Sequence, residues 1–237
     1  MVSESSVYQP AKGAEETVAF LLSLRERGIR DTALLRAMEL APRDLFAPRR
    51  FSDLARADIS LPLSCGQTMT APGIIARMLL ALKVAPGQRV FEVGAGSGYV
   101  SAVLARLAGE VISTERYRTL ALAAAERLAG LGLDNVLVLP ADGLAAGSVS
   151  GSRFDRILLN GTVAGAFPPA LLEALAPGGI LVGAHIVDGG PRLVRVTRQD
   201  ADSDESGAED APHAPFLHED LGAIRLPPLA HGVARVL

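Results

Sequence analysis

The chain is poor in several residue types on which whole classes of protein depend. Its 237 residues include one cysteine, Cys65, no tryptophan, and only 4% aromatic residues. One cysteine excludes an intramolecular disulfide framework and a multi-cysteine zinc site. The spacing of the four histidines matches no metal-ligand pattern, so we expect no metal. The scarcity of aromatic rings also disfavours a protein that stacks the bases of single-stranded nucleic acid.

Positive charge is not in excess either. The 23 Lys and Arg residues stand beside 26 Asp and Glu residues, which gives a formal net charge of -3. A chain without a basic surplus gains little affinity by displacing counterions from a phosphate backbone. We therefore expect no nucleic acid among its partners.

Long hydrophobic runs are missing as well. The most apolar region, residues 163–187, is interrupted by Pro168, Pro169 and Glu173. No apolar run reaches the roughly 18 to 20 residues that cross a bilayer. The first fifteen residues carry acidic side chains and no apolar core, unlike a secretory signal. Together with the single cysteine, these features predict a cytoplasmic protein that does not bind a membrane.

The chain does have the material for a large hydrophobic core. Hydrophobic residues make up 49% of it and charged residues 21%, which is the balance of a globular domain. Apolar residues at helical spacing predict an N-terminal helical extension within residues 1–85, and Asp31 stands where it can cap the second helix. The expected helices are residues 15–27, 32–40 and 72–82, and a loop region rich in proline, serine and glycine covers residues 46–70.

From residue 88 onward, short apolar runs alternate with helical segments. This alternation predicts βαβ units, and hence an α/β fold with a doubly wound, mostly parallel sheet in residues 86–237. We expect this core and the extension to form one compact domain. The expected strands are residues 90–93, 111–113, 136–139, 154–159, 180–186 and 193–197, and the expected helices are residues 99–107, 116–128 and 170–175.

One segment near the end of the chain has the composition of a flexible loop. Residues 199–215 contain six acidic residues, no lysine or arginine and no large apolar side chain. Such a segment cannot contribute to a core, so we expect a flexible acidic excursion. An acidic element that binds a partner is the alternative. Order is expected to return at Phe216, because apolar residues recur after it.

A glycine-rich turn follows the first expected strand of the sheet. It contains Glu92, Gly94, Gly96, Ser97 and Gly98 in the pattern E-x-G-x-G-x-G. Glycines here let the backbone approach a ligand closely. A dinucleotide fingerprint places its third glycine one residue later, so the pattern favours a nucleoside ligand without a pyrophosphate, of which S-adenosylmethionine is the obvious case. A purely structural turn is the alternative.

Two acidic residues follow the next two expected strands. Glu115 ends the second strand, where its carboxylate can accept hydrogen bonds from both hydroxyls of a ribose. Asp142 and Gly143 follow the third strand, where the acid can accept from an adenine amino group. The alternatives are a surface glutamate and an ordinary Asp-Gly turn. Because the carboxyl ends of parallel strands meet at one sheet edge, the three elements together predict a nucleoside site.

Four segments of the sequence resemble one enzyme family. Residues 61–72 (L-P-L-S-C-G-Q-T-M-T-A-P) are similar to its L-P-I-x-x-G-Q-T-I-S-x-P loop, and residues 41–46 (A-P-R-D-L-F) to its V-P-R-x-x-F element. Residues 175–179 (L-A-P-G-G) match its L-x-P-G-G turn, and residues 220–229 its terminal V-R-F-V-P-L strand. The family is that of the protein-L-isoaspartate (D-aspartate) O-methyltransferases, class I enzymes with a Rossmann-like fold. The resemblance extends from about Leu21 to Leu229.

The resemblance implies transfer of a methyl group from S-adenosylmethionine to the free α-carboxylate of L-isoaspartyl residues in damaged proteins and peptides. Thr70 takes the place of the family's active-site serine, and Gln67, Thr68, Asn160 and Arg225 lie on the substrate side. A carboxylate is already ionised at pH 7, so the reaction needs positioning more than it needs a general base.

Several substrate-side positions depart from the family pattern. Thr70 adds a methyl group to the serine hydroxyl, residues 160–162 (N-G-T) replace T-A-A, and Pro227 replaces a valine. Two alternatives follow: a related methyltransferase acting on another peptide or natural-product carboxylate, and a non-catalytic binding module with the cofactor fold. Thr70 can also be a helix N-cap, and Arg43, Arg49 and Arg50 are expected to form a solvated face.

Overall fold

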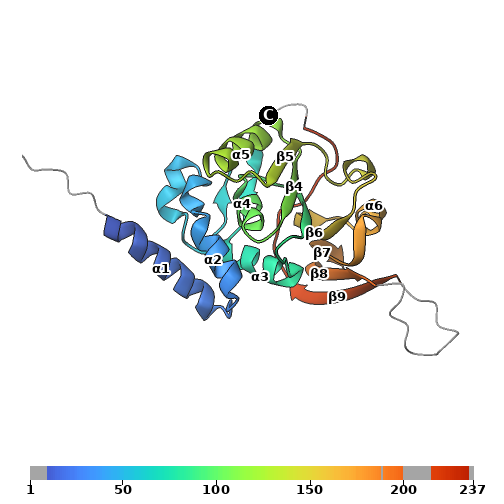
Figure 1. The fold of residues 1–237 in the computed structure, drawn as a ribbon, viewed down its shortest axis with the longest axis horizontal. Coiled ribbons are helices and arrows are strands. Elements are labelled where there is room, and N and C mark those ends of the chain that lie inside the picture. The colour runs from blue at the N-terminus through green and yellow to red at the C-terminus, as the bar shows by residue number, and fades with distance from the viewer. Residues whose placement is uncertain (1–9, 188, 200–214, 235–237) are drawn as a thin grey trace, which may run out of the picture.

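The computed structural model describes residues 10–187, 189–199 and 215–234 of the chain. A central seven-stranded sheet runs in the order β5-β4-β3-β6-β7-β8-β9 (Figure 1). The first five of these strands are parallel to one another, and β8 and β9 extend the sheet antiparallel. The sequence predicted such a mostly parallel sheet, and this prediction is confirmed.

The bounds of the elements are as follows. The helices are α1 (Pro10–Glu26), α2 (Thr32–Leu40), α3 (Pro72–Leu82), α4 (Tyr99–Ala105), α5 (Arg118–Gly130) and α6 (Pro169–Glu173). The sheet strands are β3 (Arg89–Val93), β4 (Glu110–Glu115), β5 (Val136–Pro140), β6 (Phe154–Val163), β7 (Leu175–Val187), β8 (Gly190–Arg198) and β9 (Phe216–Ala223). A separate hairpin pairs β1 (Leu61–Pro62) with β2 (Thr68–Met69) within the expected loop region.

The expected helices and strands all occur; α2 and α3 have the predicted ends, and the ends of the others are shifted. Asp31 caps α2 as predicted, because its carboxylate accepts the backbone N–H of Leu34 at 2.8 Å. Helix α4 ends at Ala105, two residues early, where the chain turns back toward β4. Strand β6 continues beyond the expected end at residue 159 as far as Val163, because Thr162 and Val163 pair with Ala184 and His185 of β7.

Two hydrophobic clusters cover the two faces of the sheet. The first cluster contains side chains from the five helices α1, α2, α3, α4 and α5, which pack against strand residues such as Val90, Val111 and Leu158. The other packs Phe91, Ile157 and their neighbours against the short helix α6 and the residues after β5. The sheet is therefore doubly wound but unevenly covered. The first cluster contains side chains from both the N-terminal extension and the core, in keeping with one shared domain.

The C-terminal segment crosses the end of the sheet after β9. Strand β9 ends at Ala223, whereas the sequence resemblance implied a strand as far as Leu229. Beyond it, Thr162 of β6 donates its N–H to Pro227 O and accepts from Leu229 N, both at 2.8 Å. The proline at 227 costs no bond here, because only its carbonyl is used. A Cβ at Gly161 would lie 2.6 Å from Leu229 Cγ, which explains the glycine.

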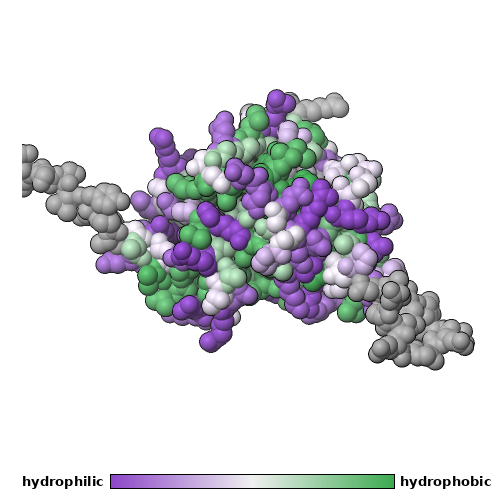
Figure 2. Space-filling view, viewed as in Figure 1, coloured by the Kyte–Doolittle hydropathy of each residue, from purple (hydrophilic) through white to green (hydrophobic). Residues whose placement is uncertain are grey.

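The acidic segment expected to be flexible lies outside the described residues except at its two ends. There Gln199 donates its N–H to Pro215 O at 3.0 Å, and β9 begins at Phe216, where order was expected to return. No helix among the described residues is both long and apolar enough to cross a membrane. On the face of the molecule seen in Figure 1, hydrophilic side chains are interspersed with apolar ones, and apolar areas lie over α1 and near α5 and β5 (Figure 2).

Candidate functional site

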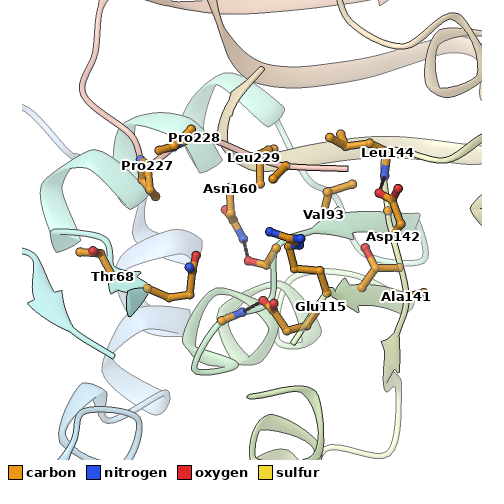
Figure 3. A pocket seen from close by; sticks show the side chains of 17 residues that line it. Thr68, Val93, Glu115, Ala141, Asp142, Leu144, Asn160, Pro227, Pro228 and Leu229 are labelled. Carbon is orange, nitrogen blue, oxygen red and sulfur yellow. Dashed lines mark hydrogen bonds between the residues drawn. The ribbon is translucent and has the colours of Figure 1, made fainter. Parts of the chain in front are cut away.

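Two adjoining cavities lie at the carboxyl ends of β3, β4 and β6. The larger has about 670 Å³ between its walls, and the smaller about 320 Å³. They open where the strand order reverses between β3 and β6, the place where open α/β sheets bind ligands. Figure 3 shows side chains from β3, β4, β6, the β1–β2 hairpin and the C-terminal segment converging on the larger cavity.

The glycine turn forms the floor of the larger cavity. Gly94 and Gly96 have φ of 89° and 55°, which favour glycine, and both line the cavity. The N–H groups of Gly94 and Ala95 donate to Thr114 O at 2.9 and 3.0 Å, so the turn is fastened to β4. A ligand can therefore lie directly against backbone, as the sequence pattern suggested.

Glu115 forms the wall next to this turn. Its two carboxylate oxygens accept the N–H groups of Gly96 and Tyr117, each at 2.9 Å. Only 5% of the residue is exposed, and what is exposed lines the larger cavity. The remaining lone pairs of the Glu115 carboxylate are therefore fixed in direction, which suits a group that accepts hydrogen bonds from the two hydroxyls of a ribose.

Asp142 and Gly143 close the far end of the larger cavity. Asp142 accepts the N–H of Leu144 at 2.9 Å on one oxygen and the N–H of Gly232 at 2.7 Å on the other. A Cβ at Gly143 would lie 2.1 Å from Thr114 Oγ1, so only glycine fits there. Asp142 thus fastens the C-terminal segment over the cavity as well as lining it.

Thr70 lies in the smaller cavity, beside Met69 and Tyr99. It does not cap α3, contrary to the alternative raised by the sequence. The N-cap of α3 is Ala71, without a side-chain bond, and the N–H of Gly73 donates to Asp58 at 2.6 Å instead. The Thr70 hydroxyl therefore stays available to a ligand in that cavity.

Arg43 is not part of a solvated face, so that expectation is wrong for this residue. It is 2% exposed, whereas Arg49 and Arg50 are exposed as expected. Its guanidinium donates to the carbonyls of Ala55, Ile59, Met69 and Thr70 at 2.5 to 3.5 Å. Burial lowers the pKa of Arg43 to about 10, so it is still charged at neutral pH. A buried charge needs partners, and the carbonyls it finds belong to the loop that carries Thr70.

Glu92 lies beneath the turn and lines neither cavity, although the sequence placed it among cofactor-binding residues. It is fully buried and accepts hydrogen bonds from Ser101, Ser113 and Asn160. Burial raises the pKa of Glu92 to about 7, while these three donors oppose the rise. Asn160 does line both cavities, together with Thr68, and Gln67 lines the larger one.

Three other predicted site residues are placed differently. Ser97 lines only the smaller cavity. Gly98 lines neither, and its missing Cβ leaves room for Ala124 of α5, which a Cβ would approach to 3.0 Å. Arg225 is exposed and lines neither cavity.

Sequence reasoning missed part of the wall. Arg116 lines the larger cavity and donates from Nε to Gly232 O at 3.0 Å. The C-terminal residues Pro228, Leu229 and Ala230 complete that wall (Figure 3). Pro228 and Leu229 end the family-like segment 220–229, but their side chains carry no polar group that would point to binding. They reach the cavity through the bonds between this segment and Thr162 of β6. Arg43, in contrast, stands within the family-like A-P-R-D-L-F element and could have been found there.

The site has the features that S-adenosylmethionine requires. It offers a glycine cradle without side chains, a fixed carboxylate on the wall and a second cavity joined to the first. We infer that Gly94, Gly96, Glu115, Asp142 and Gly143 are the residues that would hold the cofactor.

Comparisons with known proteins agree on one family. A family model described as protein-L-isoaspartate(D-aspartate) O-methyltransferase matches residues 15–210. Protein-L-isoaspartate O-methyltransferase 2 of Rhodopseudomonas palustris (strain HaA2) is 43% identical over 224 residues, covering 94% of this chain and 96% of that protein. The protein-L-isoaspartate O-methyltransferase of Azorhizobium caulinodans is 42% identical over 222 residues, with 94% and 96% covered.

Solved structures share the fold. A Plasmodium falciparum protein-L-isoaspartate O-methyltransferase, solved with S-adenosyl-L-homocysteine, superposes with a TM-score of 0.72 at 22% identity, covering 90% of this chain and 97% of that one. A second protein-L-isoaspartate O-methyltransferase gives a TM-score of 0.74 at 20% identity, covering 92% of this chain and 67% of that one.

Proposed function

Because this chain belongs to the protein-L-isoaspartate(D-aspartate) O-methyltransferase family, we propose that it methylates the free α-carboxylate of L-isoaspartyl residues with S-adenosylmethionine. The observation that carries the proposal is the pair of adjoining cavities, which share four lining residues. One has the cradle and carboxylates for a nucleoside, and the other holds the Thr70 hydroxyl. The homologue from Plasmodium falciparum was solved with S-adenosyl-L-homocysteine, the product of such a reaction.

The residues of the larger cavity divide the work of holding the cofactor. The glycine turn lets the ligand lie against backbone, and Glu115 accepts from the ribose with oxygens already oriented by two backbone N–H groups. Asp142 stands at the adenine end, and the missing Cβ of Gly143 lets this turn pack closely against Thr114. These assignments rest on geometry and on the chemistry of donors and acceptors.

The residues of the smaller cavity position the substrate. When bound, the cofactor supplies a methyl group on a sulfonium, and its transfer to a carboxylate oxygen leaves a methyl ester and a neutral thioether. The Thr70 hydroxyl donates to the substrate carboxylate and fixes its direction. Arg43 holds the Thr70 carbonyl at 3.0 Å and so orients the loop. No residue has to remove a proton, so alignment and exclusion of water account for the rate.

The proposed partners are damaged proteins and peptides that carry isoaspartyl residues. An exposed peptide can reach the smaller cavity beside the β1–β2 hairpin, since Leu63 and Thr68 line it and Thr68 is exposed. We also propose a cytoplasmic location, which suits a chain whose single cysteine cannot form an internal disulfide.

Methyl transfer to a matched pair of peptides tests the proposal. The full chain is incubated with labelled S-adenosylmethionine and either an L-isoaspartyl peptide or the same sequence with a normal aspartyl residue. Base-labile methyl ester on the first peptide alone is expected. Cofactor binding without ester on either peptide would reject the proposed reaction and favour a binding module.

A further inference from the structure

Only two side chains, Thr68 and Asn160, line both cavities within the described part of the chain; the other shared residues are Gly94 and Gly96. If the larger cavity holds the nucleoside and the smaller holds the carboxylate, the transferred methyl group must lie where the two meet. The sulfonium sulfur to which it is bonded then lies there too. Asn160 is therefore beside the one permanently positive atom of the reacting centre.

The carboxamide of Asn160 is held in one orientation. Both hydrogens of Nδ2 are committed, one to Glu92 Oε1 at 2.5 Å and the other to Gly94 O at 3.2 Å. Rotating the amide by half a turn would place its oxygen against these two acceptors. Oδ1 accepts no hydrogen bond from the described residues, and it is not among their buried unpaired atoms, so it faces the cavities. Figure 3 shows the carboxamide between Thr68 on one side and Glu115 on the other.

Glu92 is the residue that maintains this orientation. It is fully buried and is itself held by Ser101 and Ser113, which come from α4 and β4. A carboxylate fixed in this way attracts the amide hydrogens and turns the negative end of the amide dipole toward the junction of the cavities. The dipole is in place before any ligand arrives, so binding requires no reorganisation of it.

We propose that Asn160 Oδ1 faces the sulfonium centre and adds affinity for S-adenosylmethionine that the thioether product does not receive, with Glu92 as the positioning residue. The inference rests on the proposed function for the identity of the cofactor. A fixed dipole interacts strongly with a positive sulfonium and weakly with a neutral thioether of nearly the same shape. The contact therefore stabilises the reactant complex and is lost when the methyl group has been transferred.

The test is a calorimetric titration of the full chain and its variants with three ligands. S-adenosylmethionine carries the positive sulfonium, sinefungin carries an ammonium in its place, and S-adenosylhomocysteine carries a neutral sulfur. Asn160→Ala is expected to weaken binding of the two charged ligands roughly three- to ten-fold, the scale of one hydrogen bond. Binding of S-adenosylhomocysteine should change less than about two-fold.

The matched control is Asn135→Ala. Asn135 also donates through Nδ2 to backbone carbonyls, of Ala105 and Ala108 at 2.8 and 3.2 Å, but it lies just before β5 at the opposite edge of the sheet. Its removal should leave all three affinities unchanged. If Asn160→Ala melts too low to be titrated, Asn160→Thr replaces it with the same expected loss, because threonine provides no fixed amide dipole.

Glu92→Gln tests the positioning role separately. This variant replaces one of the two oxygens that hold Ser101, Ser113 and Asn160 by an amide nitrogen. It should therefore reduce the affinity for the two charged ligands more than the affinity for S-adenosylhomocysteine, while both side chains at the junction remain in place. An equal loss for all three ligands, or no loss in the Asn160 variants, would overturn the inference. An effect of the Asn160 variants confined to the KM for the peptide would also overturn the inference. Failure of the wild-type chain to methylate an isoaspartyl peptide would instead reject the proposed reaction, which these binding measurements do not depend on.

Discussion

Removal of the Glu115 carboxylate should weaken cofactor binding without unfolding the protein. The carboxylate accepts two backbone N–H groups, from Gly96 and Tyr117, and its remaining lone pairs face the larger cavity. Glu115→Ala therefore removes the proposed acceptor of the ribose hydroxyls. Hydrogen bonds to a charged group contribute roughly 1.5 to 3 kcal/mol, which corresponds to a loss of about 10- to 150-fold in affinity for S-adenosylmethionine.

The fold should survive this change because the turn has other bonds. Gly94 and Ala95 donate to Thr114 O, a backbone atom that the substitution leaves in place. A loss of about 1 to 2 kcal/mol in unfolding free energy is expected for the two N–H groups that lose their acceptor. Thermal melting of Glu115→Ala and the wild type at equal concentration measures it.

A matched carboxylate separates the ribose contact from a general loss of rigidity. Asp155 accepts the N–H of Arg89 at 2.7 Å, but at the amino ends of β3 and β6, far along the sheet from the cavities. Calorimetry should show unchanged cofactor affinity for Asp155→Ala and a large loss for Glu115→Ala. Equal affinities for Glu115→Ala and the wild type, or an equal loss in both variants, would refute the assignment of Glu115 to the ribose.

Three further outcomes are expected. Thr70→Ser should keep or raise kcat/KM, whereas Thr70→Val should lose about 1 to 3 kcal/mol of transition-state stabilisation at an unchanged melting temperature, since Thr70 does not cap α3. Glu92 has a folded pKa raised from 4.5 to about 7, so its stabilising effect is complete below pH 4.5 and disappears as the pH rises through about 7. Unfolding free energy should therefore fall by up to about 1.4 kcal/mol per pH unit in this window, and Glu92→Gln should remove that slope; an identical slope in both proteins contradicts the prediction. Arg43→Lys should cost roughly 2 kcal/mol or more, because an ammonium cannot reach four carbonyls at once, while exposed Arg50→Lys should be neutral in the same denaturant titration.

The parts of the fold that the sequence could predict are those with a local signal. Alternating apolar runs located every strand of the parallel sheet, and Asp31 marked the start of α2 through its own side chain. The glycine turn and Glu115 could be placed at one sheet edge because parallel strands end together. Element ends were less predictable, since contacts between distant segments move them. The pairing of Thr162 and Val163 with β7, for example, lengthens β6.

The parts that could not be predicted depend on contacts between distant segments. Glu92 stands in the middle of a ligand-binding motif, yet Ser101 and Ser113 hold it beneath the turn. Arginine is a charged residue that is usually exposed, and only the fold supplies the carbonyls that make the burial of Arg43 possible. Pro228 and Leu229 carry no polar group that would mark them as site residues, although they line the larger cavity.

The most direct test of the central claim is a competition between two substrates in one reaction. An L-isoaspartyl peptide and its aspartyl counterpart are mixed in equal amounts with wild-type protein and S-adenosylmethionine, and mass spectrometry follows methylation of each over time. The proposed function, which rests on the family and on the two adjoining cavities, predicts that methyl ester accumulates on the α-carboxylate of the isoaspartyl peptide while the aspartyl peptide stays unmodified. Equal methylation of both peptides, or methylation of neither, would contradict it.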